Sequence, residues 1–160
     1  MTSNHSNCTP SDPHVAASFI NIGAVYAGKG DLENALVQYQ KALEIQTRVF
    51  GSDHPDVATS FDNIGLVYQK KGDIENALVQ HQKALEIRTR VFGSDHPDVC
   101  NSFYNLACAY ATRDSMLCRD MLLKAEQTGF LHLLKEYMKT DSALDAVREL
   151  EWCKELVRRI

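Results

Sequence analysis

Residues 15–52 decide the fold: they read VAASFINIGAVYAGKGDLENALVQYQKALEIQTRVFGS and return almost unchanged as residues 57–94. At this spacing of 42 residues, 30 of the 38 positions are identical. A third copy opens with the same DHPDV at Asp95, continues as CNSFYNLACAYATRD and then diverges. Such a period predicts a stack of similar units, because one unit alone cannot bury its apolar face.

Each copy predicts a hairpin of two helices. The first helix runs from about Pro13 to Lys29, and a proline at its start fits because the first turn needs no amide donor there. Gly30 predicts a left-handed stop, and Asp31 an N-cap for the second helix, which runs on to about Phe50. The short link between the two helices predicts an antiparallel pair.

Apolar and small residues recur at the three- and four-residue steps of a helix face. In the first copy these residues are Phe19, Ile22, Gly23 and Tyr26 on the first helix, and Ala35, Tyr39 and Ala42 on the second. The second copy repeats the pattern, except that His81 replaces Tyr39. The pattern resembles the tetratricopeptide repeat. The unit length and the strings HPDVATSFDNIGLVY and ALEIRTRVFG are similar to the kinesin light chain subtype.

The resemblance covers roughly residues 13–130 and implies an all-α fold, an α-α superhelix (solenoid) of three helical hairpins followed by C-terminal capping helices. We expect the three units at about 13–52, 53–94 and 95–130. Residues 1–12 read as a disordered lead-in, and residues 131–160 as the capping helices.

The third unit loses the turn glycine, so that Cys118 aligns with Ala77 and is expected to be a small buried core residue. A short helix at about 131–139 and a last helix at about 143–159 are predicted to cap the final hairpin, with Trp152 packed rather than contacting a ligand. No matching cap precedes the first unit. A homo-oligomer through this uncapped first repeat, head-to-tail or dimeric, is therefore a possible arrangement.

Composition excludes several classes of function. The formal net charge is −4 and the pI about 5.8, with no basic cluster to bind nucleic acid or an anionic membrane surface. No apolar run is long enough to span a membrane, and the first residues lack the apolar stretch of a secretory signal. The five cysteines are an odd number without a paired framework, which predicts free thiols and a cytoplasmic protein.

Only eight positions between residues 15 and 52 differ from their partners in the second copy, and five of them lie on the first helix. These five are Ala17/Thr59, Ile20/Asp62, Ala24/Leu66, Ala27/Gln69 and Gly28/Lys70. At about 100° per residue they fall within a stripe roughly 100° wide. The stripe is either a solvent-facing surface that drifts freely or a ligand surface that diversified after duplication.

The resemblance favours a ligand surface, because first helices line the concave groove of such solenoids. In the kinesin light chain subtype an asparagine beside this stripe faces the groove, where its amide can hold a peptide backbone. That position is Asn21, repeated as Asn63 and Asn105; the alternative is that it only ties neighbouring helices together. The predicted peptide-binding groove comprises Ala17, Ile20, Asn21, Ala24, Thr59, Asp62, Asn63, Leu66, Gln69, Lys70, Asn101, Tyr104, Asn105, Cys108 and Thr112, with Tyr104 as an aromatic anchor for a moderately polar, uncharged peptide or helix.

No residue pattern predicts catalysis, a cofactor or a metal. His54 and His96 each precede a proline at a helix start, which indicates a role in the turn. His5, Cys8 and His14 do not have the spacing of a zinc site, and no nucleophile, base and orienting group assemble. We therefore expect a protein–protein interaction module (adaptor or scaffold) that binds a protein or peptide partner, with a self-assembling structural unit as the alternative, and not an enzyme.

Overall fold

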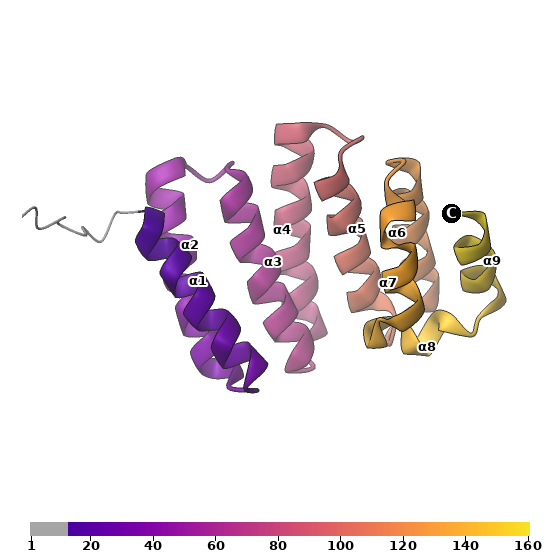
Figure 1. Ribbon diagram of the computed structural model, residues 1–160, viewed down its shortest axis with the longest axis horizontal. Coiled ribbons are helices and arrows are strands. Elements are labelled where there is room, and N and C mark those ends of the chain that lie inside the picture. The colour runs from indigo at the N-terminus through magenta and orange to yellow at the C-terminus, as the bar shows by residue number, and fades with distance from the viewer. Residues whose placement is uncertain (1–12) are drawn as a thin grey trace, which may run out of the picture.

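The computed structural model describes residues 13–160, and the predicted lead-in lies outside them. Three antiparallel helical hairpins follow one another in a single row, so that each hairpin contacts the next (Figure 1). Their helices are α1 (Pro13–Gly28) and α2 (Leu32–Phe50), α3 (Pro55–Lys70) and α4 (Ile74–Phe92), and α5 (Pro97–Tyr110) and α6 (Ser115–Gln127). The predicted all-α solenoid is confirmed for the described chain.

The turns are built by the residues that the sequence indicated. Gly30 has a φ of 79°. The Asp31 carboxylate accepts a hydrogen bond from the backbone N–H of Asn34 at 3.2 Å, which caps α2. His54 Nδ1 accepts from the Asp56 amide at 3.2 Å, and its ring stacks on Phe50 with centroids 4.4 Å apart. His96 repeats this arrangement one unit later. The repeated histidines therefore act as N-caps.

Small residues let the two helices of a hairpin approach closely. A Cβ added to Gly23 of α1 would lie 2.7 Å from the Tyr39 ring of α2, and one added to Gly65 would lie 2.7 Å from the His81 ring. Ala35 and Ala42 are completely buried between the helices. The glycine at this position is thus required by the aromatic ring that faces it.

Neighbouring hairpins stack through apolar side chains. Ile64 and Val67 of α3 are 3% and 1% exposed, and they pack in one cluster with Leu36 of α2. An exposed ion pair bridges the same two units, with Lys71 Nζ 2.5 Å from Glu33 Oε1. Arg113 and Glu75 form the equivalent pair across the next boundary. Since exposed ion pairs stabilise little, the apolar contacts hold the units together.

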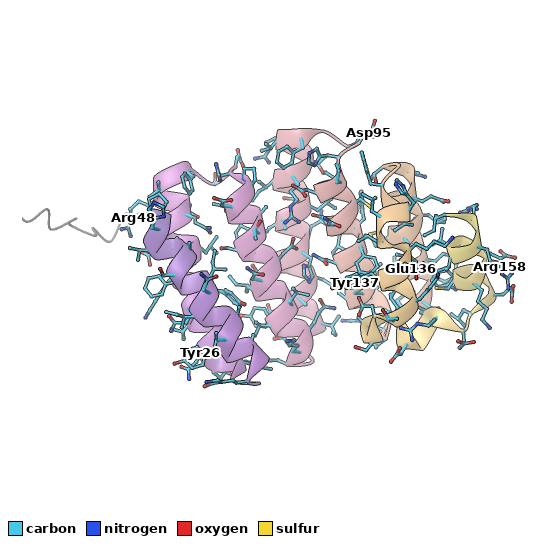
Figure 2. The ribbon with its side chains drawn as sticks, viewed as in Figure 1. Tyr26, Arg48, Asp95, Glu136, Tyr137 and Arg158 are labelled. Carbon is cyan, nitrogen blue, oxygen red and sulfur yellow. The ribbon has the colours of Figure 1, made fainter. Side chains whose placement is uncertain are left out.

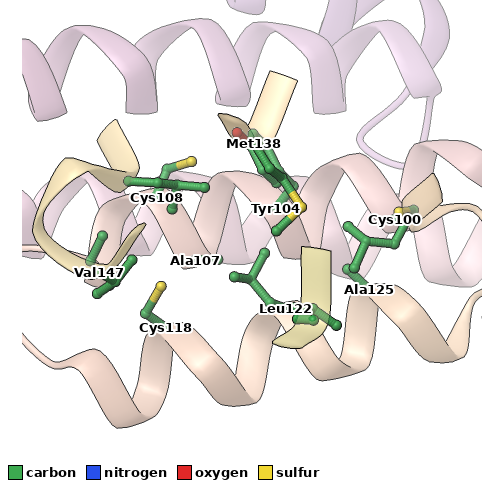
Figure 3. Close-up of a cluster of buried hydrophobic side chains, with 13 residues drawn as sticks. Cys100, Tyr104, Ala107, Cys108, Cys118, Leu122, Ala125, Met138 and Val147 are labelled. Atoms are coloured by element: carbon green, nitrogen blue, oxygen red, sulfur yellow. The ribbon is translucent and has the colours of Figure 1, made fainter. Parts of the chain in front are cut away.

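The residues after α6 cap the last hairpin. They form five short elements: the 3₁₀ helices η1 (Leu131–Leu134) and η2 (Ser142–Leu144), and the α-helices α7 (Lys135–Thr140), α8 (Asp145–Arg148) and α9 (Glu151–Arg159). Met138, Val147 and Leu156 join the buried cluster of α5 and α6, which also contains Cys118 and Leu122 (Figure 3). Glu136 and Tyr137 project from α7 at the surface (Figure 2). The cap and the buried position of Cys118 agree with the sequence analysis.

Two details differ from the expectations. The last helix is not continuous, because the backbone is extended at Leu150 between α8 and α9; this break allows both Val147 and Leu156 to be buried. Ile22 was placed on a core face, yet it is 44% exposed. Its position belongs to the contact between units, and no described hairpin precedes α1.

We predict opposite effects for two glycines of α1. Gly23→Ala should lower the free energy of unfolding by about 1–3 kcal/mol, because the new methyl group collides with Tyr39. Gly28→Ala, whose Cβ meets no atom within 4 Å, should leave stability unchanged or raise it by up to about 1 kcal/mol. Urea unfolding followed by circular dichroism measures both, and equal stabilities would contradict the packing.

Candidate partner-binding surface

The predicted stripe divides into an inward edge and an outward part. The inward edge holds Ile20, Asp62 and Tyr104 at one position and Ala27, Gln69 and Ala111 at another, all half-buried or buried. The outward part, together with the asparagines, forms what we call the first-helix surface: Ala17, Asn21, Ala24, Thr59, Asn63, Leu66, Lys70, Asn101, Asn105 and Thr112, all exposed or half-buried.

Asp62 is not on this surface. It is 6% exposed, and its carboxylate accepts hydrogen bonds from His81 Nδ1 at 2.8 Å and from Arg88 Nη1. Arg88 also donates to Ser102 Oγ of α5 at 2.7 Å, so the interaction crosses from the second unit to the third. The expectation that Asp62 faces a ligand is therefore wrong, because a buried carboxylate needs these partners to offset its desolvation.

Gln69, which is half-buried, completes the same polar cluster, which we call the Asp62 cluster: Asp62, Gln69, His81, Arg88 and Ser102. The amide Oε1 of Gln69 lies 3.0 Å from His81 Nε2. Four members of the cluster are among the eight positions that differ between the first two units, where the first unit has Ile20, Ala27, Tyr39 and Gln46. Sequence reasoning treated these differences separately. The signal that it missed is that these four positions change together, each to a polar, ionisable or longer side chain in the second unit.

Tyr104 and Cys108 are also inside the molecule. Tyr104 is 6% exposed and donates a hydrogen bond from its hydroxyl to Asp141 Oδ2 at 2.8 Å, so the chain's own tail covers it. Burial raises the pKa of the Tyr104 hydroxyl and of the Cys108 thiol well above their usual values, which keeps both neutral. The expectation that Tyr104 anchors a partner and that Cys108 faces the groove is wrong, because the capping segment packs over this part of α5.

Two cavities open along the first-helix surface at the boundaries between units. A cavity of about 350 Å³ lies between α3, α5 and the turn before η2, and it is lined by Leu66, Gln69, Lys70, Thr112 and Asp141 among others. A second cavity of about 220 Å³ lies between α1 and α3, lined by Ala17, Ile20 and Thr59 among others. Each unit boundary on this side is therefore hollowed.

Neither a metal site nor a membrane-spanning helix is found in the part of the chain that the structure describes. Residues 13–160 contain no group of three metal-ligating side chains, and none of their helices is long and apolar enough to cross a membrane. Of the three residues considered for a zinc site in the sequence, His5 and Cys8 lie outside the described residues. Cys100, Cys108, Cys118 and Cys153 are free and buried, and burial raises the pKa of Cys118 to about 12.

These hairpins, their repeated caps and their helix-to-helix stacking define a helical-repeat solenoid. A family model described as Tetratricopeptide repeat matches residues 14–89 and 62–115. The matches together span more than half of the chain, which therefore belongs to the tetratricopeptide repeat family.

Solved structures show the same fold. One is BtubC (BKLC) from P. vanneervenii, with 19% identity and a TM-score of 0.73 over 92% of this chain and 63% of that one. Another is a Podosopora anserina putative kinesin light chain with nearly identical TPR-like repeats, with 22% identity and a TM-score of 0.65 over 75% of this chain and 57% of that one. The present chain thus spans less than two thirds of either protein. No curated protein matches the sequence significantly.

The Asp62 cluster makes a prediction about stability. Asp62→Ala should lower the free energy of unfolding by about 3–5 kcal/mol, because it leaves the Arg88 charge buried without its partner. Asp56→Ala, which removes an exposed carboxylate from the same helix, should cost less than about 1 kcal/mol. Urea unfolding compares the two, and similar losses would show that the cluster is not an energetically distinct site.

Proposed function

We propose that the chain is a protein–protein interaction module that binds a peptide or helix of a partner protein along the first-helix surface. The observation that carries the proposal is a ladder of asparagines, Asn21, Asn63 and Asn105, which recurs at the 42-residue period. Asn21 is exposed and the other two are half-buried. None of their side chains makes a hydrogen bond to another residue in the described chain, so their amides are available to a partner.

The chemistry of the surface suggests the kind of partner. Each asparagine offers two donors and an acceptor, which match the N–H and C=O groups of an extended main chain. Lys70 is the one charged side chain among the members of the first-helix surface, and it has no ion pair among residues 13–160. The cavities beside Leu66 and Thr59 are lined by both apolar and polar side chains and leave room for groups of a partner. A moderately polar peptide with little charge fits this arrangement.

The tail limits where such a partner lies. Met138 and Asp141 pack over Tyr104 and Cys108, so they occupy part of the surface that α5 would otherwise present. A partner therefore contacts mainly α1, α3 and the exposed ends of α5. Family membership supports this role at the level of protein binding, and the groove assignment is our proposal.

The asparagine ladder is tested by Asn63→Ala with Asn105→Ala. A peptide selected on the wild-type protein from a displayed random library serves as the probe, and its affinity should fall about tenfold or more, because two hydrogen bonds are lost. The matched control is Gln40→Ala with Gln82→Ala, two exposed amides on the second helices, which should bind normally. Isothermal titration calorimetry measures both, and unchanged affinity of the asparagine variant would reject the groove.

We also propose self-association as a second function, because α1 presents an incomplete interface. Ile22 and Val25 are 44% and 57% exposed, whereas the equivalent Ile64 and Val67 are buried against the preceding unit. Ser18 is exposed as well, although its equivalent Ser60 is buried and donates a hydrogen bond to Gln46 Oε1 at 2.6 Å. α1 contains no Asp, Glu, Lys or Arg, so two copies of this face do not repel each other.

Analytical ultracentrifugation tests the second proposal. The wild-type protein should gain mass as its concentration rises, while Ile22→Glu with Val25→Glu should weaken association at least tenfold, because like charges would face each other. Val79→Glu, at a similarly exposed valine of α4, is the control and should associate as the wild type does. A wild-type monomer at all concentrations would exclude self-association and leave the peptide proposal standing.

A further inference from the structure

The Asp62 cluster reaches the larger of the two cavities through Gln69. We propose that Gln69, which lines the cavity beside the first-helix surface, is a specificity-determining residue, and that His81, Asp62 and Arg88 are positioning residues that fix its amide. The group that Gln69 binds is a main-chain amide of an extended peptide, which lies between α3 and α5. This inference rests on the proposed peptide-binding function.

The contacts form a continuous chain from the third unit to the cavity. Arg88 of α4 donates hydrogen bonds to Ser102 of α5 and to Asp62 of α3. Asp62 accepts a further hydrogen bond from His81 of α4. His81 then bonds Gln69, which lines the cavity. His81 is completely buried, and Gly65 lies directly against its ring. The imidazole therefore cannot turn away, and the Gln69 amide bonded to it has little freedom to rotate.

The hydrogen-bond roles leave one end of the Gln69 amide for a ligand. A carboxylate only accepts, so His81 Nδ1 donates its proton to Asp62. If Nε2 also carries a proton, it donates to the Gln69 oxygen and the NH₂ group faces the cavity. If Nε2 is unprotonated, it accepts from the NH₂ group and the Gln69 oxygen faces the cavity. Each arrangement offers one fixed polar group that matches a C=O or an N–H of a peptide main chain.

The first unit shows what the surface is without the cluster. Ala27 stands at the position of Gln69, and Ile20, Tyr39 and Gln46 replace the other three variable members. The cavity between α1 and α3 lies nearer the start of these helices, where Ala17, Ile20 and Gln46 are among its lining residues, and Ala27 does not line it. The first unit therefore has no amide at the position of Gln69, and the polar main-chain group of a bound peptide is expected between α3 and α5.

A fixed amide costs less to order than a free one, because its rotamer entropy is already lost before the ligand binds. The contribution of Gln69 to affinity should therefore depend on His81. This dependence separates a positioning role from a purely structural one.

The test installs in the second unit a combination that already folds in the first. Asp62→Ile, His81→Tyr and Arg88→Gln together reproduce Ile20, Tyr39 and Gln46, and Gly65 remains to accept the larger ring as Gly23 does. Affinity is measured by calorimetry for a peptide selected on the wild-type protein from a displayed random library. The triple variant and Gln69→Ala should each bind about three- to tenfold more weakly, and their combination no more weakly than either. Gln80→Ala, half-buried on α4, is the control.

Each outcome decides a separate point. If Gln69→Ala binds normally, Gln69 does not determine specificity; if its loss adds to that of the triple variant, His81 does not position it. If the asparagine variant also binds normally, the groove itself is rejected, which is a failure of the proposed function. Nitrogen-15 NMR decides the geometry even without a peptide. The wild-type Gln69 side-chain amide should show contacts to the His81 ring that vanish in the triple variant, and a freely averaged wild-type amide would overturn the inference.

Discussion

The structure depends on the apolar contact between one hairpin and the next. A pair of helices joined by a three-residue turn buries only the face between them, and Ile64 and Val67 would remain in water without Leu36 of the preceding unit. This constraint explains why the units follow one another in a row. It also explains the tail, since Met138, Leu144 and Val147 cover the face that α5 and α6 would otherwise expose.

Against this uniform apolar stacking, the Asp62 cluster is an exception that makes two near-identical units chemically distinct. Burying a carboxylate and a guanidinium stabilises little in itself, because their desolvation offsets their attraction. What the pair supplies is a defined geometry: Arg88 reaches across to Ser102, and His81 holds Gln69 at the cavity. The first unit packs Ile20 and Tyr39 at the equivalent positions, where its polar contact to the next unit is the hydrogen bond from Ser60 to Gln46.

The tail limits how much of the repeated surface the third unit exposes. The 42-residue period carries Asn63 to Asn105, but it also carries Asp62 to Tyr104, which the tail covers through Asp141. The third unit therefore keeps part of the repeated surface and gives up the rest to the cap. A partner bound along the three asparagines would therefore contact different side chains on α1, α3 and α5.

The sequence by itself determined the hairpins, their caps and their stacking, because these follow from local chemistry that recurs every 42 residues: Gly30 with its positive φ, Asp31 and His54 as caps, and alanines between helices. The outward members of the stripe, such as Thr59 and Leu66, also followed from helix geometry. Only the tertiary structure decided that Asp62, Tyr104 and Cys108 turn inward. A helical wheel gives the angle of a side chain around its own helix, whereas burial depends on what the neighbouring unit or the tail places against it.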